Sequence, residues 1–271
     1  MQLVLVRMVG FFRAVSSSRA LASQNERLRE LDALKDEFIA SVSHELRTPL
    51  TSIQGYLELV QTEESDNLRP EQREFLAIVD RNSERLLGLV SDLLFVAQVD
   101  AGRLELTLAE TDLGLLVEQT VESARLVAAE KGIRLNAEIE ERPLVHADRG
   151  RLAQVLDNLV SNALKFTPPG GSVRVQLRTS EAKAILEVSD SGVGMPAEDQ
   201  EHLFDRFYRT PSARQQAVPG TGLGLSIAKA IVDAHKGKIG VISSEGRGTV
   251  FRIELPLAGP AGIPLPNKVA A

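Results

Sequence analysis

A histidine and a glutamate stand side by side at positions 44 and 45 of the chain. The helical pattern around them places Val42 and Leu46 on an apolar stripe. His44 lies about 200° around the helix from either one. We therefore expect its imidazole to face solvent, where it can act as a nucleophile or exchange protons. The carboxylate of Glu45 can orient the ring or accept its proton.

A proline follows this pair at a fixed offset. Pro49 has no N–H to donate to the carbonyl of Glu45, so we expect the helix to bend one turn after His44. An isolated surface histidine is most often a solvated side chain without a role. Here the neighbouring acid, Thr48 and the proline together favour a functional histidine.

Two asparagines and a lysine form a second constellation. Asn158, Asn162 and Lys165 are spaced i, i+4 and i+7, so they share one face of a helix. Amide oxygens with a lysine suit a Mg²⁺–triphosphate, because Mg²⁺ prefers hard oxygen ligands. The alternative is a plain polar helix face. Since asparagine is a poor helix former, two of them in mid-helix favour a ligand-binding role.

The third motif is Asp190-Ser191-Gly192-Val193-Gly194, directly after a predicted strand. A carboxylate at a strand end, such as that of Asp190, can accept a hydrogen bond from an exocyclic amine. Gly192 and Gly194 let the backbone approach a flat ring. Turn chemistry alone could also place these residue types here.

The fourth motif, Gly220-Thr221-Gly222-Leu223-Gly224, opens a predicted helix over 223–234. Glycine-rich backbone before a helix N-terminus is suited to bind an anion. Its GxGxG spacing matches neither the Walker nor the dinucleotide pattern. The polar segment Arg209 to Pro219 is interpreted as a mobile lid over a nucleotide. Gly246-Arg247-Gly248-Thr249 is interpreted as a tight turn joining the last two strands.

Two long helical patterns must position the histidine. Apolar residues recur in steps of three and four from Ser23 to about Glu64, and again from Pro70 to a stop near Gly102. Together they predict an antiparallel hairpin over residues 23–103. A hairpin supplies only half of a four-helix core, so we expect a homodimer that forms a four-helix bundle.

Residues 104–257 alternate between strand and helix patterns and predict a mixed α/β domain. The predicted strands are residues 104–108, 133–139, 173–177, 184–188 and 250–255. The predicted helices are residues 112–130, 148–166 and 223–234. Residues 258–271 are rich in Gly, Pro and Ala and predict a disordered tail. The junction at Ala101-Gly102-Arg103 is the predicted hinge.

Composition removes several classes of protein. The formal charge of −6 argues against a nucleic-acid binder, and the absence of cysteine excludes disulfides and thiolate sites. No apolar run is long enough to form a complete membrane helix. Residues 1–22 leave two alternatives open: the end of a membrane helix that would anchor a longer protein in the inner membrane, or a linker helix from a missing sensor region.

Taken together, the segments resemble the catalytic core of a bacterial sensor histidine kinase of two-component signalling. The corresponding H, N, G1, F and G2 boxes are Ser43–Leu50, Asn158–Thr167, Asp190–Gly194, Phe204–Phe207 and Gly220–Gly224. All five occur in family order, with no departure within them. The resemblance implies a dimerisation and phosphotransfer hairpin followed by an ATP-binding α/β sandwich of the gyrase and Hsp90 type, in a cytoplasmic location.

The resemblance also implies roles for single residues. His44 would receive the γ-phosphoryl group of ATP and pass it to an aspartate on a response regulator receiver domain. Glu45 would act as the base, and Thr48 would position water in the reverse phosphatase reaction. Asn162 would bind Mg²⁺, while Asn158 and Lys165 would contact phosphates. The remaining implied nucleotide contacts are Asp190 to adenine, Gly192, Gly194, Phe204, Arg209, Gly220, Thr221, Gly222, Leu223 and Gly224.

Two other classes compete with this interpretation. An interaction protein could use the hairpin for dimerisation alone, which leaves the His44–Glu45 pair unexplained. A conformational ATPase of the gyrase or Hsp90 kind would lack the histidine. It would carry a water-activating glutamate just before the first asparagine, where this chain has Asp157.

Overall fold

A computed structural model describes residues 46, 48–58, 60, 68–215, 218 and 220–258 of the 271-residue chain, except for the side chain at position 85. The chain divides into two compact units, Met1–Leu104 and Glu105–Ala271. The described part contains no helix long and apolar enough to span a membrane.

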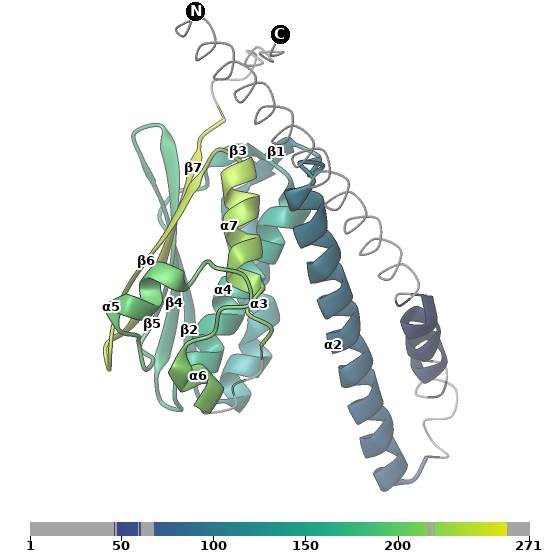
Figure 1. Cartoon of the computed structure of the whole chain (residues 1–271). Helices are drawn as coiled ribbons and strands as arrows, with labels where there is room; N and C mark the ends of the chain where they lie inside the picture. Colours follow the sequence, from purple (N-terminus) through teal and green to yellow (C-terminus); the bar gives the residue numbers. More distant parts are fainter. Residues whose placement is uncertain are drawn as a thin grey trace, which may run out of the picture. The chain divides into compact units, whose positions relative to one another are not determined.

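The described part of the first unit is mostly helical (Figure 1). Residues 48–58 form one helical segment, and α2 spans Pro70–Asp100. Pro70 starts α2, where its missing N–H costs no hydrogen bond, and Gly102 ends it with a φ of 64°. Both ends of this helix match the prediction. Most of the predicted 23–64 helix lies outside the described residues.

The second unit is a two-layer α/β sandwich. Its five-stranded sheet has the order β2-β4-β5-β7-β6, in which only the β2–β4 pair is parallel. The strands are β2 Arg134–Ile139, β4 Ser172–Ser180, β5 Lys183–Asp190, β6 Lys238–Ser244 and β7 Gly248–Pro256. A separate antiparallel pair joins β1 (Ala109–Asp112) to β3 (Leu144–Ala147).

Three helices cover one face of the large sheet: α3 (Leu113–Glu130), α4 (Arg149–Phe166) and α7 (Gly224–Ala234) (Figure 1). α4 lies between the other two. Asp112 and Asp148 cap α3 and α4 by accepting backbone N–H groups of Leu115 and Arg151. Short helices α5 (Ala197–His202) and α6 (Pro211–Gln215) precede α7.

The core lies between the helices and the sheet. Its most buried side chains are aliphatic and come from both layers, including Val117, Leu159, Val173, Leu177, Ile227 and Ile231. Exposed ion pairs such as Arg174–Glu138 join neighbouring strands. Burial of the aliphatic layer supplies the main driving force that holds the helices on the sheet.

The predicted strand over 104–108 is wrong. Its residues alternate as a strand would, but β1 begins only at Ala109, opposite Ala147. After Ala147, strand β3 ends and Asp148 becomes the N-cap residue of α4. No strand backbone is therefore left for residues 104–108 to pair with. Thr107 N donates instead to the Asp148 carboxylate at 3.1 Å. Strands β1, β3 and β6 lie outside the predicted strand ranges, whereas the predicted turn joining the last two strands lies between β6 and β7.

Candidate nucleotide-binding site

Helix α4 carries the two predicted asparagines and the lysine in its middle and last turns. Asn158 and Asn162 are half-buried, and Lys165 is exposed. The Asp148 cap fixes where the helix begins and therefore which way each of these side chains faces.

Asn158 connects two predicted boxes that lie far apart in sequence. Its Nδ2 donates to the carbonyl oxygen of Gly224, the first residue of α7, at 3.2 Å. A Cβ added at Gly224 would lie 3.1 Å from Asn158 Oδ1, so a side chain there would press on the amide. The asparagine face of α4 and the glycine-rich loop thus lie against each other.

The side chain of Asn162 makes no hydrogen bond to any other described residue, although it is half-buried. Such an amide is costly to bury unless a ligand or water completes it. An amide oxygen is a hard oxygen ligand, the type of group that Mg²⁺ binds. This part of the site therefore fits the predicted metal role.

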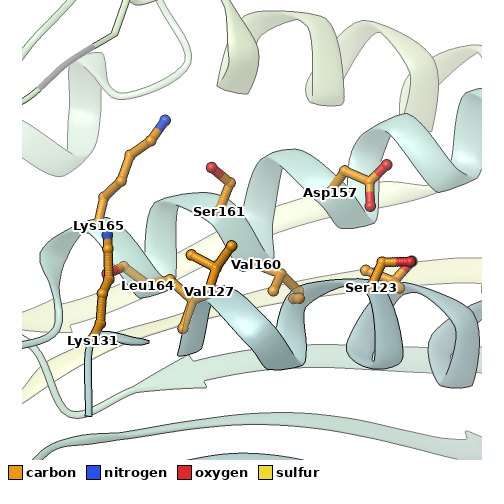
Figure 2. A pocket seen from close by; sticks show the side chains of 10 residues that line it. Ser123, Val127, Lys131, Asp157, Val160, Ser161, Leu164 and Lys165 are labelled. Carbon is orange, nitrogen blue, oxygen red and sulfur yellow. The ribbon is translucent and has the colours of Figure 1, made fainter. Parts of the chain in front are cut away.

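Lys165 lies at the rim of an open groove between α3 and α4, with a volume of ≈ 300 Å³ (Figure 2). Asp157 and Ser161 share this rim, and Val127 and Leu164 contribute apolar surface. Lys131 Nζ donates to the carbonyl of Leu164 at 3.2 Å. Figure 2 shows the side chain of Lys165 extending away from Lys131.

Asp157 does not share the orientation of Asn158. It lines the groove toward α3, whereas its neighbour bonds to α7. Partial burial raises the pKa of the Asp157 carboxyl.

Asp190, the last residue of β5, has a carboxylate with a fixed orientation. Its Oδ1 accepts Gly192 N at 2.8 Å and Thr249 N at 3.2 Å. Within the described part of the chain, Oδ2 keeps no protein donor and can accept from a base amine. Burial raises the pKa of Asp190, and the two backbone donors partly offset that rise.

The glycines after Asp190 stand where backbone segments approach closely. A Cβ at Gly192 would lie 2.9 Å from the carbonyl carbon of Phe166, and one at Gly194 would lie 2.7 Å from that of Ser244. Gly194 also has a φ of 63°. Both positions therefore require glycine for steric reasons. Val193 N donates to Phe166 O, so the loop is anchored to the end of α4.

The turn between β6 and β7 does more than join two strands. Thr249 supplies the second donor to Asp190, and Gly248 (φ 87°) passes so close to the Asp190 carbonyl that no Cβ would fit. The sequence signal for this role is the Gly-x-Gly-Thr spacing. In the structure, Gly246 and Gly248 have positive φ and Thr249 is buried, whereas a surface turn needs no buried threonine.

The predicted F box contacts the glycine-rich loop. Phe207 N donates to Gly222 O at 3.0 Å, and a Cβ at Gly222 would lie 2.6 Å from the Phe207 carbonyl carbon. Phe204 is half-buried, with Lys229 Nζ 5.8 Å from its ring centroid. Thr221 Oγ1 accepts Leu223 N at 3.2 Å, which shapes the loop before α7.

Arg209 begins the predicted lid, and its guanidinium bonds to the lid backbone. Nη2 donates to the carbonyl oxygens of Ala213, at 3.2 Å, and Val218. In this structure, Arg209 therefore binds the backbone of Ala213 in α6 and the backbone of Val218. No nucleotide phosphate is needed to explain its position. Gly220 has open space where a Cβ would stand.

His44 and Glu45 lie outside the described residues. Thr48 is described and stands exposed in the helical segment 48–58. Within the second unit, the structure joins predicted residues in pairs: Asn158 with Gly224, Phe207 with Gly222, and Asp190 with Gly192.

The three-helix layer on a mixed sheet, with an amide-bearing helix beside a glycine-rich loop, defines an ATP-binding domain of the class shared by histidine kinases, gyrase and Hsp90. Residues 147–259 match the family described as histidine kinase-, DNA gyrase B-, and HSP90-like ATPase. Residues 34–102 match the His Kinase A (phospho-acceptor) domain. The chain belongs to the bacterial sensor histidine kinases of two-component systems, whose enzyme class is protein-histidine kinase.

Similar proteins support this assignment. The sensor histidine kinase TmoS of Ectopseudomonas mendocina is 40% identical over 244 residues, which are 90% of this chain and 25% of that protein. WalK of Bacillus subtilis is 37% identical over 230 residues, 84% of this chain and 37% of that protein. The chain therefore spans well under half the length of these relatives.

Solved structures agree at the level of the fold. Full-length ShkA in complex with AMPPNP superposes with a TM-score of 0.69 at 33% identity, covering 83% of this chain and 47% of that one. The histidine kinase AdeS of Acinetobacter baumannii gives a TM-score of 0.57 at 27% identity, covering 80% of this chain and 98% of that one.

Proposed function

We propose that this chain uses Mg²⁺-ATP to phosphorylate His44 and then passes the phosphoryl group to an aspartate on a response regulator receiver domain. The observation that carries the proposal is the hydrogen bond from Asn158 to Gly224. It joins the amide-bearing helix to the glycine-rich loop and leaves the neighbouring amide of Asn162 for a ligand.

Each group of the site has a proposed task. Asp190 Oδ2 accepts the adenine amine, Asn158 and Lys165 contact phosphates, and Asn162 holds Mg²⁺. When bound, Mg²⁺ neutralises phosphate charge and so makes the γ-phosphorus easier to attack. Arg209 acts indirectly, by holding the lid backbone.

At the hairpin, a ring nitrogen of His44 forms a bond to the γ-phosphorus as the bond to the bridging oxygen breaks and ADP leaves. Glu45 accepts the ring proton. The left-handed Gly102 after α2 provides a hinge that lets the ATP-binding domain reach the histidine. Thr48 positions water for the reverse phosphatase reaction toward the regulator.

The chain is proposed to act as a homodimer. Leu50 and Leu57 are buried, whereas the first half of α2 exposes Phe75, Ile78 and Val79. Bulky apolar side chains on one helical stripe are costly in water. A second copy of the hairpin would cover them and complete a four-helix bundle.

The test of the proposed function is the variant His44→Gln, incubated with Mg²⁺ and γ-labelled ATP. We expect undiminished nucleotide binding and loss of label incorporation. His146→Gln, an exposed histidine on β3, is the matched control and should incorporate label normally. Undiminished labelling of His44→Gln would refute His44 as the acceptor. Steady ATP hydrolysis without any phosphoprotein would favour the conformational ATPase.

A further inference from the structure

His235, the cap residue after α7, belongs to none of the motifs described above. It is only 6% exposed, and both ring nitrogens are engaged. Nδ1 lies 2.8 Å from the carbonyl oxygen of Ile231, and Nε2 lies 2.9 Å from the backbone nitrogen of Asp148. A carbonyl only accepts and an N–H only donates, so the ring is neutral with its proton on Nδ1.

The bond to Asp148 joins the end of α7 to the start of α4. At the other end of α7, Asn158 bonds to Gly224. The two helices therefore run antiparallel and are fastened at two points, separated by about 15 Å along α4 and about 16 Å along α7. Because the two spans match, the bonds together prevent α7 from sliding along α4.

Asp148 is itself firmly held. Its Oδ1 accepts Arg151 N and its Oδ2 accepts Thr107 N, each at 3.1 Å. The residue that receives His235 is thus fixed both to the first turn of α4 and to the segment before β1. It provides a rigid anchor for the end of α7.

From this geometry we infer that His235 is a positioning residue for nucleotide binding. It sets the register of α7 against α4 and thereby the place of the glycine-rich loop relative to Asn158 and Asn162. The inference rests on the proposed function, since it assumes that this face binds ATP. His235 itself does not reach the nucleotide; it acts through Asp148 and α7.

The inference is tested on the full chain by titrating a non-hydrolysable ATP analogue with Mg²⁺ in a calorimeter. His235→Phe keeps a ring but leaves the Asp148 N–H without its acceptor. We expect the Kd to rise about tenfold, a size typical of the coupling between two sites. His235→Gln offers an amide oxygen to the same N–H and should restore affinity to within about twofold of wild type.

Two controls separate positioning from general destabilisation. Val175→Ala truncates a buried side chain of β4 and should lower the unfolding temperature without changing the Kd. His146→Phe alters an exposed histidine and should change neither. If His235→Phe lowers stability but binds the analogue as wild type does, the inference is wrong. It is also wrong if folded His235→Gln binds no better than His235→Phe.

If His235→Phe does not fold, hydrogen exchange of the wild-type protein tests the inference instead. Coupling between the bond and the nucleotide is reciprocal, so the analogue should slow exchange of the Asp148 amide more than that of amides in β4. Equal slowing would overturn the inference. If the wild-type protein does not bind the analogue, the proposed function is wrong. If the wild-type protein binds it and the His235 variants bind it equally well, only this inference is wrong.

Discussion

Thr249 donates its backbone N–H to Oδ1 of Asp190 at 3.2 Å, across 59 residues of sequence. Gly192 N donates to the same oxygen. Two donors on one oxygen stop the carboxylate from rotating and direct the other oxygen, Oδ2, away from them. The carboxylate proposed to accept the adenine amine is therefore held in one orientation without any ligand, and such pre-orientation lowers the entropic cost of binding.

Asp190→Asn is expected to weaken ATP binding by about tenfold or more, the cost of an unpaired buried donor or acceptor. An amide has one oxygen: if that oxygen faces Gly192 and Thr249, its NH₂ group confronts the adenine amine. Calorimetric titration with ATP measures the change. Asp233→Asn, an exposed carboxylate on α7, is the control and should bind normally. Wild-type affinity in Asp190→Asn would contradict the adenine role.

The burial of Asp190 also predicts a pH dependence of stability. Burial raises the pKa of Asp190 in the folded chain above its unfolded value. The folded state then binds the proton more tightly, so this contribution to stability is fully present below the unfolded pKa and is lost as pH rises through the folded pKa. Thermal unfolding of wild type and Asp190→Asn, compared from about pH 4 to about pH 7, measures it. Parallel curves for the two proteins would contradict the prediction.

Gly222→Ala is expected to lower ATP affinity strongly. Gly222 has a φ of 77°, and a Cβ there would stand 2.6 Å from the carbonyl carbon of Phe207. The added methyl group would push the glycine-rich loop away from residues 204–207. Gly240→Ala on β6 is the matched control, because its Cβ would meet nothing within 4 Å. Titration with ATP should show weakened binding only for Gly222→Ala; equal affinities would contradict the proposed role of the loop.

Phe75→Glu is expected to shift the chain from dimer to monomer, because a charge would replace a side chain that is 65% exposed on the apolar stripe of α2. Light scattering after gel filtration measures the mass. The control Glu84→Lys changes an exposed residue about half a turn around the same helix and should leave the dimer intact. A wild-type mass for Phe75→Glu would argue against this face as the dimer interface.

Local chemistry made several elements predictable. Helical patterns over 112–130 and 148–166 predicted α3 and α4, and Pro70 and Gly102 predicted the ends of α2. These signals lie within a few residues of the element that they define. The prediction of a strand over 104–108 was wrong because alternation of apolar and polar residues does not show whether a neighbouring strand is present to pair with.

By itself, the sequence determined which residue types are available to bind a nucleotide and on which helix face or loop each one stands, because helical periodicity and turn preferences act over short distances. Only the tertiary structure decided that Asn158 meets Gly224, that Thr249 orients Asp190, and that His235 reaches Asp148. Each of these bonds joins residues far apart in sequence, and their meeting depends on how the helices and the sheet bury their apolar faces together.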